Sequence, residues 1–301
     1  MRPTLRQLEY LIAVADTGRI GMAAAQLNVS QPSLSAQIAE VEATLGATLF
    51  LRGRTGATLT ATGEEVVRRA RLILQEHQDL CAVAKGAGIF GGRLRLGVLP
   101  SIGPYLLPGV VRRLHAEHPS LRLLVREEST RDLDQGLRAG RFDMIISTPE
   151  DHPGTRITTL FTEQLWLATP LDHRLADRGA PVPLDQLRGE TLLTIGAGHR
   201  LSHVVAGLAA QSGAQVSQEY EGTSLDAVRL MAASGTGLAI LPEVYALSEA
   251  KRGTDLCLRP LAGAGTSRTL SLIQPALPDP RTGSDILINV LRAEAARILR
   301  P

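Results

Sequence analysis

The sequence contains little cysteine and no apolar run long enough to cross a membrane. Its two cysteines, Cys81 and Cys257, stand among apolar neighbours, where a free cysteine is usually a small, buried apolar side chain. Near the N-terminus the only apolar run is 10–15, bounded by Glu9 and Asp16, whereas a membrane helix needs roughly 20 such residues. We therefore expect neither a signal peptide nor a membrane anchor, and a cytoplasmic protein.

Motifs of the common enzyme classes are also absent. The sequence has no Gly-Lys-Ser/Thr phosphate loop, no Gly-x-Ser-x-Gly elbow and no metal cluster of paired cysteines or of two histidines with a carboxylate. The run 233–237 contains Gly-x-Gly, but it lacks the later glycine of a dinucleotide fingerprint and precedes a predicted strand. His115 and His118 have no third ligand nearby in the sequence, as is usual for surface histidines. We expect no enzyme activity, no metal and no cofactor.

An excess of charge of one sign is missing as well. The formal net charge is +2 at pH 7, and acidic residues nearly match the arginines of residues 1–60. DNA binding therefore has to be argued from a motif, and it needs a dimer to collect enough contacts. The chain does have size, because 301 residues with 44% hydrophobic composition can bury more than one core. A small N-terminal domain followed by a larger one is the natural expectation.

The stretch 22–46 has the pattern of two helices joined by a tight turn. The first helix carries small and apolar residues and ends at Asn28-Val29. Ser30 can accept hydrogen bonds from the free N–H groups at the start of the second helix, and Pro32 lies in its first turn, where a missing N–H costs nothing. The second helix is expected to bury one apolar stripe, made of Leu34, Ile38, Val41 and Leu45.

The outward face of this second helix is polar and mostly uncharged. Such a pair of helices is typical of a helix-turn-helix that reads base edges in a major groove, and a plain helical hairpin is the alternative. Residues 5–15 predict a third helix, and residues 49–60 predict a two-stranded wing whose arginines reach phosphate. The candidate DNA-binding residues are Ser30, Gln31, Pro32, Ser33, Ser35, Gln37, Arg52 and Arg54.

Residues 64–86 form one long helical pattern, followed by a glycine-rich hinge at 87–92. The helix carries an apolar stripe with spacings of four and three. The stripe comprises Val66, Ala70, Ile73, His77, Leu80 and Ala84, widened by Val67, Leu74 and Cys81. Packing against its own domain is one explanation, and pairing with a second copy is the other. Pairing would place two DNA readers on one face of the DNA.

From residue 93 to 301 the pattern changes to alternating strands and helices, which predicts an α/β domain. A first unit comprises strands 94–99, 121–126 and 143–147 with helices 105–115 and 133–138. A second unit comprises strands 165–168, 192–195, 215–221 and 238–241 with helices 202–211 and 225–233. The strand 269–273 and the helix 285–299 are expected to return to the first unit. Two such lobes make a cleft, where small ligands usually bind.

Hydroxyl groups gather at the predicted strand ends and helix starts, where ligands of open α/β sheets lie. Each hydroxyl alone is explained by helix capping. Taken together they predict a site for an anionic or polar effector, which Arg200 would strengthen. The candidates are Ser101, Thr130, Thr223 and Ser224, with Arg200.

The N-terminal motifs resemble those of the LysR-type transcriptional regulators. The pattern A-A-x-x-L-x-V-S-Q-P-S/T-L-S-x-Q-I of that family stands here at 23–38, and L-F-x-R and L-T-x-x-G follow at 49–52 and 59–63. The resemblance implies a mostly α-helical winged helix-turn-helix with a linker helix, and a two-lobe α/β effector domain like that of periplasmic binding proteins. The implied domains are the DNA-binding domain 3–63, the linker 64–86, the hinge 87–92 and the effector domain 93–301.

Some positions depart from the family pattern. Gly21 and Met22 stand where many members have a polar or basic residue, and Arg54 lies one position before the usual wing arginine. These departures predict fewer phosphate contacts and a flatter salt dependence. The partners implied by the resemblance are double-stranded promoter DNA of imperfect dyad symmetry, a small-molecule effector, a second copy bound through the linker helix, a homotetramer and RNA polymerase.

A closer resemblance is to the OxyR-type peroxide sensors within that family. The run 103–108 matches their G-P-Y-L-L-P signature, and Thr130 and Gly198-His199 are in step. Where that subfamily has its peroxidatic cysteine this chain has Arg200, and near Ala209 the resolving partner is missing too. A thiolate switch needs an exposed cysteine of low pKa and a second cysteine to trap it.

The absence of the two cysteines favours a signal other than peroxide. Ser101, Thr130 and His199 would form a polar pocket with the fixed positive charge of Arg200, which suits a small anionic effector. For His199 a structural role is the alternative. Two other functions stay open: an oxidative-stress regulator with a non-standard redox mechanism, and a solute-binding protein, which would leave residues 1–63 unexplained.

Overall fold

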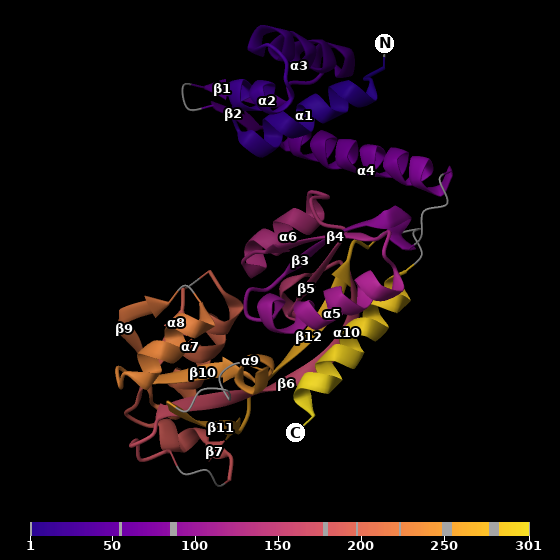
Figure 1. The fold of residues 1–301 in the computed structure, drawn as a ribbon. Helices are drawn as coiled ribbons and strands as arrows, with labels where there is room; N and C mark the ends of the chain where they lie inside the picture. Colours follow the sequence, from indigo (N-terminus) through magenta and orange to yellow (C-terminus); the bar gives the residue numbers. More distant parts are fainter. Residues whose placement is uncertain are drawn as a thin grey trace.

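The structure, a computed structural model, describes residues 2–53, 56–84, 89–176, 180–196, 198–222, 224–248, 255–276 and 283–300. A small helical domain comes first, a long helix follows it, and two α/β lobes complete the chain (Figure 1). The predicted fold class is confirmed. Within the described ranges, no helix is both long enough and apolar enough to span a membrane.

The N-terminal domain has the predicted three helices, α1 (Leu5–Thr17), α2 (Ile20–Gln26) and α3 (Gln31–Leu45). Ser30 caps α3 by accepting a hydrogen bond from the N–H of Ser33 at 3.3 Å, and Pro32 lies in the first turn. Leu34, Ile38 and Val41 are buried as predicted, but Leu45 is 42% exposed. Leu45 is the last residue of the helix, and its side chain lies outside the core.

The wing consists of β1 (Phe50–Gly53) and β2 (Gly56–Leu59), which pair antiparallel. The carboxylate of Glu42 on α3 accepts hydrogen bonds from the N–H groups of Leu49 and Phe50 at 2.8 and 3.0 Å. This contact fixes the wing against the helix that carries the candidate base-reading residues.

Gly63 lies where the helix α4 (Ala61–Ala84) begins, directly against the wing. A Cβ built at this position would stand 2.1 Å from the carbonyl oxygen of Leu49. We expect Gly63→Ala to destabilise the N-terminal domain by about 1–3 kcal/mol, since the backbone would have to move. Thermal unfolding of the full chain measures this.

Gly207 provides the matched control for Gly63→Ala. It lies in the helix α7 (Arg200–Ser212), and a Cβ there would meet nothing within 4 Å. Gly207→Ala is expected to be neutral or to stabilise by up to about 1 kcal/mol, through helix propensity alone. Equal melting temperatures for Gly63→Ala and the wild type would contradict the close approach.

The apolar stripe of the long helix α4 is buried in its first half and exposed in its second half. Packing against its own domain therefore explains the first half, and the second half is open to pairing with a second copy. Val67 and Ala70 are buried against the N-terminal domain, whereas Ile73 and Leu80 are 50% and 70% exposed. Cys81 is exposed too, so the expectation of a buried side chain is wrong there. The reason is that α4 runs on beyond α1 (Figure 1). In the predicted hinge, 89–92 form a short 3-10 helix, and 87–88 lie outside the described residues.

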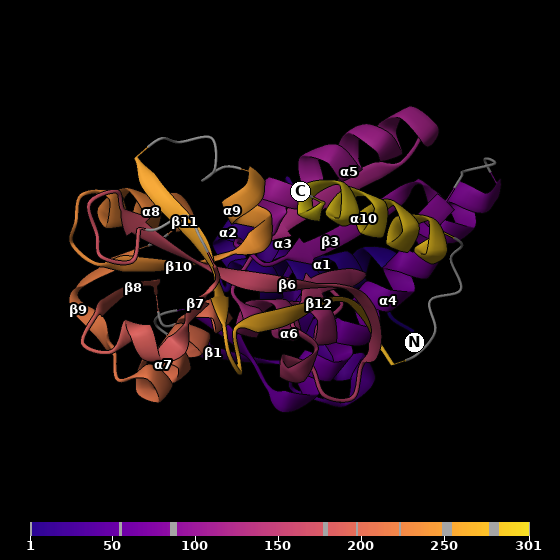
Figure 2. The same cartoon turned by 90° about the horizontal axis from the view of Figure 1, so that it is seen from below.

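Lobe I contains the first predicted α/β unit and the C-terminal segment that returns to it. Strand β3 (Arg93–Val98) pairs parallel with β4 (Arg122–Glu127) and β5 (Met144–Ser147), and β12 (Ser267–Gln274) pairs antiparallel with β5. Helices α5 (Gly103–Glu117) and α10 (Ser284–Leu299) lie on one side of these strands and α6 (Thr130–Arg138) on the other (Figure 2). A 3-10 turn, η2 (Pro149–Asp151), follows β5.

Lobe II holds the second unit. Strand β8 (Thr191–Ile195) pairs parallel with β9 (Gln215–Gly222) and β10 (Leu238–Pro242). The remaining elements of this lobe are β7 (Val182–Pro183), η3 (Leu184–Leu187), α7, α8 (Leu225–Ala233), α9 (Glu243–Ser248) and β11 (Leu256–Ala262). Cys257 on β11 is buried, as predicted.

One strand, β6 (Arg156–Pro170), joins the lobes and is much longer than the predicted 165–168. Its first half pairs with β12 of lobe I and its second half with β10 and β11 of lobe II. The first half has polar residues between its apolar ones, so it offers no continuous apolar run to recognise. The result is two hydrophobic cores, one at each half of this strand.

Candidate DNA-reading surface and inter-lobe pocket

The start of α3 presents an exposed polar surface. Gln31, Pro32 and Ser33 are exposed, and Ser30 is exposed while its hydroxyl caps the helix. Gln31 and Ser33 have no side-chain hydrogen bond within the described part of the chain, so their polar groups are available to a base edge.

The other candidates on this surface are already bonded within the domain. Gln37 accepts a hydrogen bond from Gln7 at 3.2 Å and donates one to Glu40 at 3.0 Å. Ser35 accepts from Arg52 at 3.1 Å, and Arg52 also pairs with Glu42 at 3.4 Å. The side-chain amide of Gln37 is therefore bonded within the domain, unlike that of Gln31 in the described part of the chain. Arg54 lies outside the described residues.

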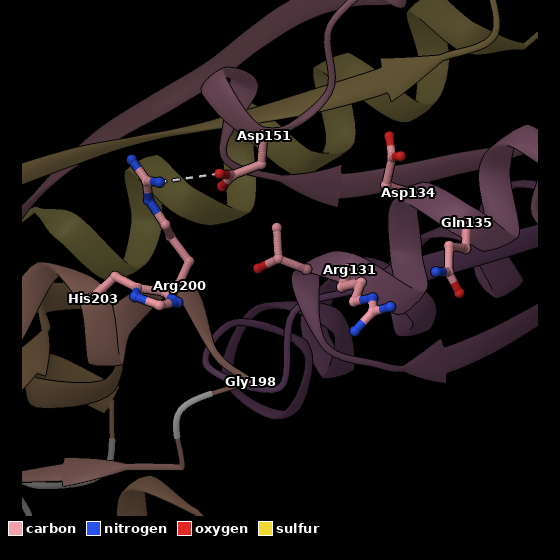
Figure 3. A pocket seen from close by; sticks show the side chains of 8 residues that line it. Arg131, Asp134, Gln135, Asp151, Gly198, Arg200 and His203 are labelled. Atoms are coloured by element: carbon pink, nitrogen blue, oxygen red, sulfur yellow. Dashed lines mark hydrogen bonds and ion pairs between the residues drawn. The ribbon is translucent and has the colours of Figure 1, made fainter.

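The effector domain contains a pocket of about 630 Å³ between the lobes, at the N-terminal ends of α6 and α7. Of the predicted effector residues, Thr130 and Arg200 line it. The other lining residues are Arg131, Asp134, Gln135, Asp151, Gly198 and His203. Figure 3 shows Arg200 and His203 on one side of the pocket and Arg131, Asp134 and Gln135 on the other. Both lobes thus contribute charged groups to one site.

An ion pair crosses this pocket from lobe to lobe. Nη1 of Arg200, at the first position of α7, lies 3.0 Å from Oδ1 of Asp151 in η2 (Figure 3). The second carboxylate oxygen of Asp151 accepts a hydrogen bond from the hydroxyl of Thr148. The positive charge expected to be available to an anion is therefore paired in this structure.

Asp134 is a second carboxylate of the pocket. Burial acts to raise its pKa, but hydrogen bonds from Arg138 at 2.7 Å and with His152 at 3.1 Å outweigh burial, so the pKa of Asp134 lies below its usual value. Asp134 therefore carries a fixed negative charge at neutral pH. The hydroxyl of Thr130, in contrast, is buried and has no hydrogen-bond partner in the described part of the chain.

Several predicted effector residues lie away from this pocket's lining. Ser101 is buried, and its Oγ accepts a hydrogen bond from Arg268 at 3.0 Å. Ser224 caps α8 by accepting from the N–H of Ala227 at 3.2 Å, as the capping alternative held. His199 precedes α7 but makes no side-chain cap. Thr223 lies outside the described residues.

Five lining residues were not among the predicted ones: Arg131, Asp134, Gln135, Asp151 and His203. The prediction rested on hydroxyl groups at strand ends and helix starts, and the same rule applies to charged residues. Asp151 comes shortly after the end of β5, so that rule would have found it. The others lie within the first two turns of α6 and α7.

The two lobes also contact each other through α5 of lobe I and through α8 and α9 of lobe II. The hydroxyl of Tyr245 in α9 donates to Asp226 in α8 at 2.8 Å, and the hydroxyl of Tyr105 in α5 lies 3.5 Å from the same carboxylate. The two rings meet edge to face at 4.7 Å. Burial raises the pKa of Tyr245, so this phenol stays a hydrogen-bond donor. These contacts join lobe I to lobe II at a second place.

A winged helix-turn-helix joined to a two-lobe α/β domain with a pocket between the lobes defines a transcriptional regulator with a ligand-binding domain. Residues 5–64 match the description "Bacterial regulatory helix-turn-helix protein, lysR family", and residues 87–296 match "LysR substrate binding domain". The chain belongs to the LysR family of transcriptional regulators. This family assignment replaces the alternatives of a helical hairpin and of a solute-binding protein.

Similar proteins include the DNA-binding transcriptional dual regulator OxyR of Escherichia coli K12, which is 33% identical over 291 residues, 96% of this chain and 95% of that protein. A probable hydrogen peroxide-inducible genes activator of Streptomyces viridosporus is 34% identical over 274 residues, 90% and 88% of the two chains. The resemblance to the OxyR-type members is thereby confirmed.

Two solved structures are similar over nearly the whole chain. A full-length OxyR variant from Pseudomonas aeruginosa has a TM-score of 0.78 and 29% identity, covering 97% of this chain and 95% of that one. Full-length CbnR in complex with its target DNA has a TM-score of 0.54 and 26% identity, covering 97% of this chain and 99% of that one.

Proposed function

We propose that this regulator binds a small anionic effector in the pocket between its lobes and thereby changes how it binds promoter DNA. The observation that carries the proposal is the joint position of Arg200 and Thr130, which line one pocket at the N-termini of α7 and α6. Helix N-termini and a guanidinium both favour an anionic group. Ser101 and His199 would then support the site from outside its lining.

The proposal includes a dimer that reads promoter DNA of imperfect dyad symmetry in the cytoplasm. Its support is the exposed apolar half of α4, with Ile73 and Leu80, and the exposed polar groups of Gln31 and Ser33 at the start of α3. The complex of the similar protein CbnR with its target DNA points the same way. Tetramer formation and contact with RNA polymerase belong to the same proposal.

A redox function is the second candidate, because relatives at 33–34% identity are named as hydrogen peroxide-inducible activators. The residues of this chain argue against a thiol switch. Arg200 occupies the position of the expected reactive cysteine, and Cys257 is buried with its thiol donating to the carbonyl of Ala176 at 2.8 Å. Cys81 is exposed on the linker helix, far along the chain from Cys257.

The effector proposal is tested by footprinting the full-length protein on the DNA upstream of its own gene in the presence of a panel of small organic acids. At least one acid is expected to change the footprint, and Arg200→Ala is expected to bind DNA but to ignore that acid. An Arg200→Ala protein that responds like the wild type would remove the pairing role of this arginine.

A further inference from the structure

The charges that line the inter-lobe pocket are balanced. Lobe I supplies the carboxylates of Asp134 and Asp151, and basic groups come from Arg131 of lobe I and from Arg200 and His203 of lobe II. Apart from His203, two arginines and two carboxylates line one space of about 630 Å³, and Arg138, outside the lining, also pairs with Asp134 at 2.7 Å. The pocket is thus built for charges of both signs.

The ion pair between Arg200 and Asp151 makes the binding of a simple anion to Arg200 unfavourable. To bind the guanidinium, it would displace a carboxylate held at 3.0 Å and leave that carboxylate beside a new negative charge. Like charges so placed repel each other, and a charge that loses its partner in a partly buried site is costly.

A ligand with one anionic and one cationic group avoids this cost. Its anionic end can take the place of Asp151 on Arg200, and its ammonium group can take the place of Arg200 on Asp151. The unpartnered hydroxyl of Thr130 in the wall of the pocket offers a further hydrogen bond. Every charge that the ligand separates then regains a partner.

We infer that the effector is a small zwitterion, a molecule that carries a carboxylate or similar anionic group together with a protonated amine. The inference rests on the proposed function and narrows it, since it adds a cationic group to the anionic effector that the same pocket takes. Binding inserts the ligand between Arg200 of lobe II and Asp151 of lobe I. The direct link between the lobes becomes a bridged one, and this difference between free and bound protein is what an effector needs in order to shift a conformational equilibrium.

Titration calorimetry of the full-length protein tests the inference with matched probes. The probes are the ω-amino acids from glycine to aminohexanoate and the common α-amino acids, each compared with the carboxylate and the amine of the same carbon skeleton. At least one amino acid is expected to bind about tenfold or more tightly than both of its matched partners. The inference is overturned if no amino acid binds, or if a carboxylate binds as tightly as its amino acid.

Two single variants assign the charges. Asp151→Asn is expected to weaken the binding of the amino acid by about tenfold and to strengthen that of its matched carboxylate, because Arg200 loses its internal partner. Arg200→Gln is expected to weaken the binding of the amino acid and to strengthen the binding of the matched amine. Arg229→Gln is the control, since Arg229 pairs with Asp255 at 2.8 Å and does not line the pocket; it is expected to bind as the wild type does.

The same titrations separate failure of this inference from failure of the proposed function. An anion that needs Arg200 but is indifferent to Asp151→Asn would keep the effector pocket and overturn the zwitterion. An effector that changes the footprint while its affinity is unaffected by changes at Arg200, Asp151 and Thr130 would bind elsewhere and would overturn both.

Discussion

Replacing Gln31 with alanine is expected to weaken binding to the cognate DNA site by about 2–6 kcal/mol in the dimer. Gln31 is the first residue of α3, and its amide is exposed and unbonded within the described part of the chain. A bidentate contact between a glutamine and a base edge contributes about 1–3 kcal/mol of discrimination, and a dimer makes it once in each half-site. Gln31→Ala should therefore lower the affinity for the cognate site more than the affinity for unrelated DNA.

Fluorescence anisotropy with the cognate DNA and a shuffled duplex, at one fixed salt concentration, measures this loss. Gln37→Ala is the matched control on the same helix, because Gln37 is bonded to Gln7 and Glu40. Gln37→Ala should weaken binding to the cognate DNA much less than Gln31→Ala does. Equal binding of the cognate site by Gln31→Ala and the wild type would contradict the assignment, as would equal losses on both duplexes, since only a base contact discriminates between them.

Glu163→Gln is expected to destabilise the effector domain by about 3–5 kcal/mol, because it leaves a buried guanidinium without its counter-charge. Glu163 on β6 accepts hydrogen bonds from Arg268 on β12 and from the N–H of Val244 at the start of α9, each at 2.8 Å. Both charged side chains are buried. Burial raises the pKa of Glu163, while Arg268 and the N–H of Val244 oppose that rise by favouring the carboxylate.

Urea unfolding followed by tryptophan fluorescence measures this effect. Trp166 is the only tryptophan of the chain and lies on β6 close to Glu163, so it reports on the effector domain. The exposed pair of Glu117 and Arg113 is the control, and Glu117→Gln should cost less than about 1 kcal/mol. An unchanged unfolding midpoint for Glu163→Gln would show that the buried pair does not stabilise the packing of β6, β12 and α9.

The N-terminal domain could be predicted well because its signals are local. The cap at Ser30, the proline in the first turn and the turn at Asn28, which has a φ of 55°, all lie within a few residues of the elements they determine. The length of β6 could not be predicted in the same way. Its polar first half is a strand because β12, more than a hundred residues later, pairs with it.

The same contrast holds for the pocket. Thr130 and Arg200 lie at helix starts, which a local pattern marks, and the structure brings them to one pocket. Ser101 also follows a strand end, but its hydroxyl is bonded to Arg268, whose approach depends on the pairing of β12 with β6, far from Ser101 in the sequence. No sequence spacing shows that approach, nor the pairing of Arg200 with Asp151.

We propose that this LysR-family protein binds its operator DNA without a thiol switch. The most direct test is a footprint of the purified full-length protein on the DNA upstream of its own gene, under reducing conditions, with and without hydrogen peroxide. We expect protection of a region of imperfect dyad symmetry that peroxide leaves unchanged. A footprint that changes with peroxide would contradict the loss of the switch and direct attention to Cys81 and Cys257, and the absence of any footprint at low salt would contradict the proposed operator.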